Sequence, residues 1–251
     1  MRHIRLFAAA AAALSLSCAA AAAAGKQPLA ARLTDRLGAA PTRIEPSPVP
    51  GWRLAVYGTQ VFLVSEDGRW LVNGAVLSLE RGEDILEARR RQARLEAIEG
   101  FGERNMIVFP AKERRRLLTV FTDVSCPYCR AFHRDVPALN EAGITVRYVP
   151  FALAPPGSPR HRLMVSVWCA KDRRAALTAA KSDRPVPERR CESPVDAGTR
   201  LGRLLGFTGT PTLVTDTGEV LRGLVPAAQL VQMLAGKAPA RPTPAAARGT
   251  R

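Results

Sequence analysis

The sequence contains few residues that could bind a metal ion. It has five cysteines and three histidines in 251 residues. Cys126 and Cys129 form a C-x-x-C pair, and the sequence has neither a second C-x-x-C pair nor an H-x-x-x-H pair. A tetrahedral zinc site needs two further ligands. Half of a zinc site is therefore the weaker interpretation of this pair, and we expect no bound metal.

The start of the chain lacks an apolar run long enough to cross a membrane. Leu6–Leu16 is too short to do so, and it follows two arginines and precedes the small residues Ala22–Ala24. This order is typical of a cleavable secretory signal peptide, which we place at residues 1–24. A lipid anchor on Cys18 is the alternative, although the residues before it form a poor acylation context. We therefore expect an exported protein.

Cleavage of the signal peptide would also remove Cys18. The mature chain would then keep four cysteines, an even number, in an oxidising compartment. Two disulfides are arithmetically possible.

Acidic residues are outnumbered, with 22 against 37 basic residues and a formal net charge of +15. A basic chain can bind nucleic acid. Here, however, the arginines are spread along the chain, no nucleic-acid recognition motif is present, and export would separate the protein from nucleic acid. We expect no nucleic-acid partner and a solvated, arginine-rich surface. Such a surface attracts anionic lipid or acidic unfolded chains weakly and in a salt-dependent way.

The segment FTDVSCPYCR, which contains Cys126 and Cys129, carries the main chemical signal of the chain. Residues 117–124 are rich in Val, Leu, Thr and Phe, and they predict a short buried strand. A helix is predicted directly afterwards, because Pro127 suits the first helical position and apolar residues recur on one face before Gly143. Cys126 is thus expected at a helix N-terminus.

That position favours the thiolate form of Cys126. Free N–H groups and the helix dipole stabilise an anion there, and Arg130 and Arg134 add positive charge. We predict that Cys126 is the attacking nucleophile. Cys129 lies one turn further into the helix, close enough to attack a mixed disulfide on Cys126 and release the substrate. This thiol chemistry needs no cofactor.

Asp123 and His133 flank the two cysteines and could act in proton transfer. Asp123 is better explained as fixing the end of the strand than as a base, and His133 as a partly packed histidine than as a proton shuttle.

Pro137 should kink the helix, because proline lacks the N–H and clashes with the preceding turn. Ile144–Pro150 then predicts a strand, and the helix is long enough for a parallel crossover between the two strands.

Length and composition suit two modest domains. In the first, residues 29–37 suit a short helix and residues 41–51, with four prolines, an extended connector. The strands predicted for a small antiparallel meander are residues 52–57, 60–64 and 70–79. This N-terminal domain, residues 25–81, has little core of its own. We expect it to gain burial by pairing with a second copy of the chain.

A linker helix is predicted at residues 82–104. Its apolar stripe is thin, and Glu87 and Arg91 are spaced for an i,i+4 ion pair. Because glycines end it, we interpret it as a mostly exposed, stiff spacer that belongs to neither core. The second domain is placed at residues 105–236. The Pro- and Ala-rich residues 237–251 are expected to be disordered.

Residues 158–206 of the second domain predict a helical insertion, in which two Ser-Pro pairs mark helix starts. Cys169 and Cys191 flank the connection between the helices. In an exported chain they suit a structural disulfide, which would contribute roughly 3 kcal/mol by closing the loop. A pair of free buried thiols is the alternative. The chain then turns through residues 206–214 into a hairpin, and residues 226–234 predict a last helix.

The order strand, C-x-x-C helix, strand, helical insertion, Thr-Pro turn, hairpin and helix resembles the thioredoxin fold. Four segments are similar to the DsbC/DsbG family of periplasmic disulfide isomerases: Phe121–Cys129, Gly143–Tyr148, Trp168–Asp172 and Gly209–Thr212. The resemblance runs from about residue 29 to residue 234. It implies an α+β protein with an N-terminal cystatin-like dimerisation domain, a linker helix and a C-terminal thioredoxin fold with a helical insertion.

The resemblance also implies roles for the cysteines. Cys126 matches the attacking cysteine and Cys129 its resolving partner, while Cys169 and Cys191 match the structural disulfide of DsbC. Between the active cysteines this chain has Pro-Tyr, the DsbG pattern, whereas DsbC typically has Gly-Tyr. The second cysteine pair favours the DsbC side of the family.

Three further residues are predicted to bind substrate. Thr210 and Pro211 match the cis-proline loop of the family. Without the resemblance, an X-Pro bond has only about a 5–6% chance of being cis. Such a loop exposes the Thr210 backbone, which can pair with an extended substrate beside Cys126. Tyr128, between the two cysteines, completes the expected substrate-binding set.

The function implied by the resemblance is a periplasmic enzyme that isomerises or reduces non-native disulfides. Its partners would be misfolded, disulfide-containing exported proteins, a second copy of itself in a homodimer, and a membrane reductase of the DsbD type. One alternative is a DsbG-like chaperone that holds unfolded chains and has secondary thiol reductase activity. Another is a net oxidase, which would require a strongly depressed pKa of Cys126 and no dimer.

Overall fold

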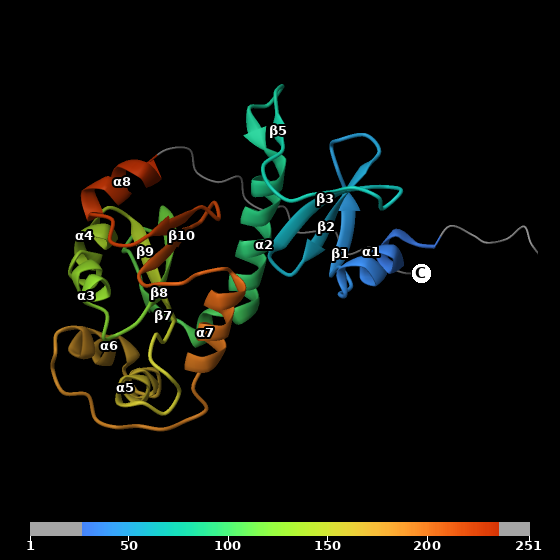
Figure 1. Ribbon diagram of the computed structural model, residues 1–251. Coiled ribbons are helices and arrows are strands. Elements are labelled where there is room, and N and C mark those ends of the chain that lie inside the picture. Colours follow the sequence, from blue (N-terminus) through green and yellow to red (C-terminus); the bar gives the residue numbers. More distant parts are fainter. Residues whose placement is uncertain (1–26, 236–251) are drawn as a thin grey trace, which may run out of the picture.

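The computed structural model describes residues 27–235. The predicted signal peptide and the predicted disordered tail lie outside the described residues. The described chain combines helices with two main sheets, which confirms the predicted α+β class, and the sheets lie on either side of one long helix (Figure 1). Within the described range, no helix is long and apolar enough to cross a membrane.

The N-terminal unit is a four-stranded antiparallel sheet with a short helix. Its elements are α1 (Leu29–Leu37), β1 (Arg43–Pro46), β2 (Trp52–Tyr57), β3 (Gln60–Ser65) and β4 (Leu71–Val72), and the strands lie in that order in the sheet. Successive side chains of a strand point to opposite faces. Leu54 and Val56 therefore pack with Leu86 of the next helix, α2 (Ile85–Phe101), while Ala55 packs with Leu33 of α1.

The structure corrects two predictions in this unit. Residues 41–51, predicted as a connector, contain β1, whose one proline, Pro46, is tolerated because β1 is an edge strand. Residues 70–79, predicted as one strand, form two short ones. These are β4, which pairs with β3, and β5 (Leu77–Ser78), which pairs with β6 (Glu83–Asp84). The Asn-Gly pair at residues 73–74 interrupts the strand, because both residue types favour turns.

Helix α2 contributes to both cores, which makes the prediction of an exposed spacer wrong. Near its start, the fully buried Leu86 belongs to the N-terminal core. Near its end, the fully buried Ile98 belongs to the same cluster as Phe121 of the C-terminal unit. Figure 1 shows the helix between the two sheets. The apolar stripe appeared thin because each end of the helix buries its side chains against a different partner.

The C-terminal unit is built on a five-stranded sheet with the order β11-β10-β8-β9-β7. The strands are β7 (Ile107–Phe109), β8 (Arg116–Thr122), β9 (Ile144–Pro150), β10 (Thr212–Thr215) and β11 (Val220–Arg222). Strands β8 and β9 are parallel, as predicted from the helix that connects them, and the other pairs are antiparallel. The end of β8 thus lies near the middle of the sheet.

Helices lie on both faces of this sheet (Figure 1). They are α3 (Pro127–Arg134), α4 (Val136–Glu141), α5 (Pro159–Trp168), α6 (Arg173–Lys181), α7 (Val195–Leu204) and α8 (Ala227–Ala235). The break between α3 and α4 falls at Asp135, two residues before Pro137, where a kink was predicted. Helix α6 was not predicted separately. It lies within the helical insertion, between α5 and α7.

Candidate active site

Two free cysteines mark the start of α3, directly after the central strand β8. Cys126 is the N-cap residue and Pro127 is the first residue of the helix. The exposed fraction is 8% for Cys126 and 1% for Cys129. A disulfide in a client can therefore reach Cys126 more readily than Cys129, which supports Cys126 as the nucleophile.

The surroundings of Cys126 favour its thiolate. A hydrogen bond from the Cys129 thiol is the largest cause that lowers the pKa of Cys126, to about 5. The backbone N–H groups of Cys129 and Tyr128, at the start of α3, lower it further, while burial opposes the shift. At neutral pH Cys126 is therefore ionised, as expected for a cysteine at a helix N-terminus.

The arginines predicted to assist Cys126 are placed differently. Arg130 donates from Nε to the Val124 carbonyl oxygen at 3.0 Å, and its Nη1 lies 2.6 Å from a carboxylate oxygen of Asp183. Arg134 is an exposed residue at the other end of α3. The Cys126 thiolate is thus stabilised by the Cys129 thiol and by backbone N–H groups, and not by these two guanidinium groups as predicted.

Cys129 has the opposite electrostatic character. Burial, the largest cause, raises the pKa of its thiol well above the usual range, and the hydrogen bond to Cys126 raises it further. Lys181 and Thr122 act in the other direction, but burial outweighs them. Cys129 therefore stays protonated while Cys126 attacks, and it can act only after Cys126 has reacted.

The loop before β10 lies beside Cys126. The Thr210–Pro211 peptide bond is cis, and the Thr210 carbonyl oxygen lies 3.2 Å from the Cys126 sulfur. Thr212 pairs with Phe121 of β8 in the sheet register, which holds this loop next to the start of α3. The fold thus brings Thr210 and Pro211 next to Cys126. The sequence resemblance assigned these residues to one site although the Thr-Pro pair lies far from Cys126 in the chain.

Tyr128 is the exposed member of the C-x-x-C segment. Its exposed fraction is 63%, whereas both neighbouring cysteines are buried. An aromatic side chain at this position can contact a bound chain without covering the Cys126 sulfur. This placement is compatible with the predicted role of Tyr128 in substrate binding.

Asp123 and His133 have structural partners. Asp123 accepts hydrogen bonds from the backbone N–H groups of Ser125 at 2.7 Å and Leu153 at 2.9 Å, so it fixes the end of β8. The ring of His133 hydrogen-bonds to the Tyr148 hydroxyl and to Thr178. Burial lowers the pKa of His133 to about 4. A neutral, fully bonded imidazole fits the interpretation of a packed histidine.

Lys181 also belongs to this site, which was not predicted from the sequence. It is the last residue of α6 and only 4% exposed, yet its ammonium group lies next to Thr122, Asp123 and Cys129. No local pattern marks it, because it stands in an ordinary alanine-rich helix. Only the packing of the helical insertion against α3 reveals its position.

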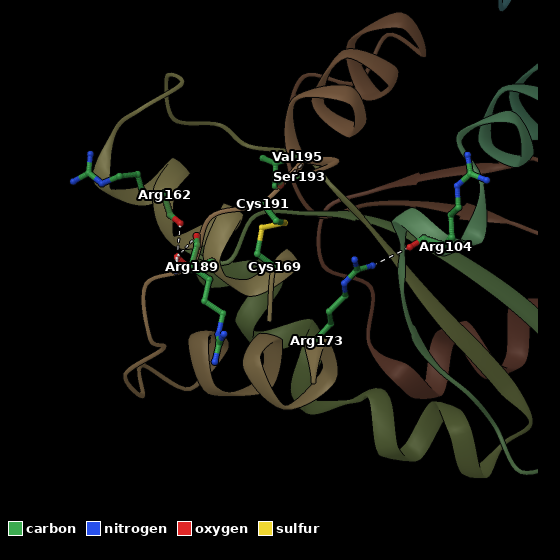
Figure 2. Close-up of a disulfide and its surroundings, with 9 residues drawn as sticks. Arg104, Arg162, Cys169, Arg173, Arg189, Cys191, Ser193 and Val195 are labelled. Carbon is green, nitrogen blue, oxygen red and sulfur yellow. Dashed lines mark hydrogen bonds between the residues drawn. A yellow bond between two sulfur atoms is a disulfide. The ribbon is translucent and has the colours of Figure 1, made fainter. Parts of the chain in front are cut away.

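Cys169 and Cys191 form a disulfide at the end of α5 (Figure 2). Three residues before Cys169, the Ser166 hydroxyl donates to the Arg162 carbonyl oxygen at 2.9 Å and accepts from the Arg189 N–H at 3.1 Å. The disulfide and these hydrogen bonds attach the segment after α6 to α5. They therefore hold the insertion that carries Lys181.

Comparisons with known proteins match both units of the chain. The family model described as the disulfide bond isomerase protein N-terminal domain matches residues 17–87. The model described as a thioredoxin-like domain matches residues 103–237. Together with the free cysteine pair, the fold defines a thioredoxin-like thiol:disulfide oxidoreductase.

Curated relatives narrow this class. The thiol:disulfide interchange protein DsbC of Dickeya dadantii is 32% identical over 202 residues, which is 80% of this chain and 83% of the relative. The DsbC of Haemophilus influenzae is 33% identical, over 76% of this chain and 82% of the relative. The chain belongs to the DsbC family of thiol:disulfide interchange proteins. This membership confirms the predicted resemblance and does not favour the DsbG-like alternative.

Among solved structures, the chain is similar to a disulfide interchange protein from Neisseria gonorrhoeae. The identity is 28% and the TM-score is 0.49, and the match covers 53% of this chain and 96% of that one.

Proposed function

We propose that this protein isomerises or reduces non-native disulfides in exported proteins. The Cys126 thiolate attacks a wrong disulfide of the client and forms a mixed disulfide. A free client thiol then rearranges that bond, or Cys129 attacks it and releases the reduced client. The observation that carries the proposal is the contrast between the two thiols: the pKa of Cys126 is lowered to about 5, whereas burial raises the pKa of Cys129.

Client binding is assigned to Thr210, Pro211 and Tyr128. With the Thr210 carbonyl oxygen 3.2 Å from the Cys126 sulfur, an extended client backbone that pairs with this loop would pass directly over the nucleophile. The exposed Tyr128 ring, two residues after Cys126, would supply apolar contact to the client. The Cys169–Cys191 disulfide has a structural role in this proposal.

The protein acts as a homodimer formed by the N-terminal units, residues 25–81. Support comes from β4, the last strand of its sheet within the described residues, because an open edge can pair with another chain. Trp70 and Leu71 at this edge are exposed by 66% and 39%. A second copy would cover this apolar surface.

The proposed compartment is the periplasm, reached through a signal peptide at residues 1–24. A thiol kept reduced in an oxidising compartment needs an electron donor, for which we propose a membrane reductase of the DsbD type. Helix α2 belongs to the proposed linker at residues 82–104, and residues 105–236 form the proposed catalytic domain, followed by a tail at residues 237–251.

Trapping of clients tests the assigned roles. Cys129→Ala should accumulate mixed disulfides with exported clients through Cys126, because attack survives and resolution is lost. Cys126→Ala should trap none, although it keeps the buried thiol. Equal trapping by both variants would reverse the assignment of the nucleophile. Recovery of activity from a scrambled, disulfide-rich client measures isomerisation directly, and no recovery with the wild-type protein would contradict the proposed function.

A net oxidase remains the second candidate, because a Cys126 pKa lowered to about 5 also suits a strong oxidant. The steady-state redox form of the exported protein separates the two functions. An isomerase or reductase is kept with Cys126 and Cys129 reduced, whereas an oxidase is kept with them joined. Alkylation of free thiols in cells quenched with acid measures this ratio.

A further inference from the structure

Lys181 is a buried cation without an ion-pair partner among the described residues. Its exposed fraction is 4%. Its Nζ donates a hydrogen bond to the Thr122 hydroxyl at 2.7 Å and lies 3.5 Å from the carbonyl oxygens of Asp123 and Cys129. These oxygens satisfy the ammonium hydrogens but supply no full negative charge. Lysine is rarely buried without a charged partner, so this arrangement calls for an explanation.

The charge around Lys181 is supplied mainly by the redox site. The titratable groups that face it are Cys126, Cys129, Arg130 and His133 of α3 and its cap, Asp123 after β8, and Tyr148 of β9, whose ring centroid lies 5.5 Å from Nζ. His133 and Tyr148 are neutral at pH 7, because burial lowers the pKa of the first and raises that of the second. Asp123 already accepts two backbone hydrogen bonds. The cysteines are thus the groups whose charge changes during the reaction.

We propose that Lys181 is a positioning residue for the resolving step: its buried ammonium stabilises the Cys129 thiolate at the moment that thiolate forms. The inference rests on the proposed function and deepens it. The ammonium group contacts the backbone of Cys129 itself, whereas Cys126 already receives N–H groups from the helix start. Cys129 is the thiol that burial holds protonated, so it is the one that needs a cation.

The step balances without any further reactant. Cys129 loses its thiol proton to solvent, and its sulfur attacks the Cys126 sulfur of the mixed disulfide. The bond between Cys126 and the client sulfur breaks, and the client leaves as a thiolate that takes up a proton. The client disulfide has then gained two electrons, and the two cysteines, now joined, have lost two. Lys181 is unchanged throughout.

A single stopped-flow experiment separates this step from the first attack. In the mature protein, with Cys126 and Cys129 reduced and the Cys169–Cys191 disulfide intact, dithionitrobenzoate should react in two phases, and each phase should release one coloured thiolate. The first phase, which depends on reagent concentration, reports attack by Cys126. The second, which does not, reports resolution by Cys129. Cys129→Ala should show only the first phase, which identifies the two.

Lys181→Met removes the charge and keeps the length of the side chain, and Lys181→Arg is the matched control that keeps the charge. At pH 7 we expect Lys181→Met to slow the second phase roughly tenfold and to raise its pH midpoint by about one unit, the equivalent of one pKa unit. Its first phase should stay within about twofold of the wild type. Lys181→Arg should keep both phases near the wild-type rates.

An unchanged rate and pH midpoint of the second phase in Lys181→Met would overturn the inference, and so would an equal loss in both phases. Should Lys181→Met fail to fold, Lys181→Gln, which also removes the charge, takes its place in the comparison with Lys181→Arg, and the same outcomes decide. A missing first phase in the wild type would instead contradict the proposed function.

Discussion

At the scale of single residues, the chemistry depends on two thiols one helical turn apart that have opposite environments. The Cys126 sulfur lies at the helix start, where N–H groups have no partner within the helix. Cys129 is one turn further in and 1% exposed, so its ionisation is suppressed by burial. Attack and resolution are therefore ordered in time, because the second thiol becomes reactive only when the first has formed a disulfide.

This asymmetry predicts the pH dependence of alkylation in the reduced protein. Reaction of Cys126 with iodoacetamide should rise with a midpoint near pH 5, following its lowered pKa, while Cys129 should react at least about a hundredfold more slowly at pH 7. Since the folded-state pKa of Cys126 lies below the unfolded value of about 8.5, the thiolate adds stability that is complete above that value. The stability is lost as pH falls through about 5. A Cys126 midpoint near 8.5 would contradict the prediction.

Pro127→Gly tests how far the helix start determines redox poise. Glycine frees the φ angle that proline holds near −65°, so the N–H groups directed at Cys126 become less pre-organised, although glycine also adds an N–H. We expect loss of pre-organisation to dominate, raising the pKa of Cys126 by up to about one unit and making the pair more reducing by about 30 mV. Thiolate absorbance against pH and equilibration with glutathione measure the two quantities. A lower pKa with a more oxidising pair would show that the added N–H dominates.

At the scale of elements, sequence patterns identified what is local and missed what depends on packing. Residues 117–124 and Ile144–Pro150 were predicted as strands because buried strands have distinctive composition, and they correspond to β8 and β9. The start of α3 was predicted from Pro127, because the preference of proline for the first helical turn depends only on the local sequence. The burial of Lys181 could not be predicted, because it depends on where an inserted helix lies against α3. The burial of Cys129 also depends on this packing and could not be predicted either.

Helix α2 shows the same limit and leads to a stability prediction. Ile98 is fully buried and belongs to the cluster of Phe121 and Phe207. Ile98→Ala should lower the free energy of unfolding of the C-terminal unit by about 2–5 kcal/mol, through lost burial and the cavity left behind. Leu95→Ala, at a half-buried position of the same helix, is the control and should cost less. Denaturant melts followed by tryptophan fluorescence measure both, and equal small losses would contradict this role of Ile98 in the core.

At the scale of the whole molecule, helix α2 attaches one sheet to the other rather than merely separating them. Arg147 of β9 is 3% exposed, and its Nη2 lies 2.6 Å from Glu99 near the end of α2. At the N-terminal sheet, the Thr59 hydroxyl donates to the Leu204 carbonyl oxygen of α7 at 2.9 Å. The orientation of each redox site relative to its N-terminal unit is thus fixed by contacts at two places, and a dimer would hold two such sites in a defined arrangement.

If the N-terminal units pair through the β4 edge, one charge at that edge should separate the protomers. Trp70 is 66% exposed and directly precedes β4, so in the dimer Trp70→Glu would bury a carboxylate without a partner. Loss of a central aromatic contact typically costs about 2 kcal/mol or more, which raises the dissociation constant at least about 30-fold. We expect a folded monomer that reduces small disulfides at the wild-type rate but isomerises scrambled clients poorly, because one chain carries out the chemistry whereas two chains are needed to hold a client.

Leu37→Glu, at an exposed apolar position at the end of α1, is the matched control and should stay dimeric. Sedimentation velocity together with the two activity assays measures each variant, and a Trp70→Glu protein that remains dimeric and fully active in isomerisation would place the interface elsewhere.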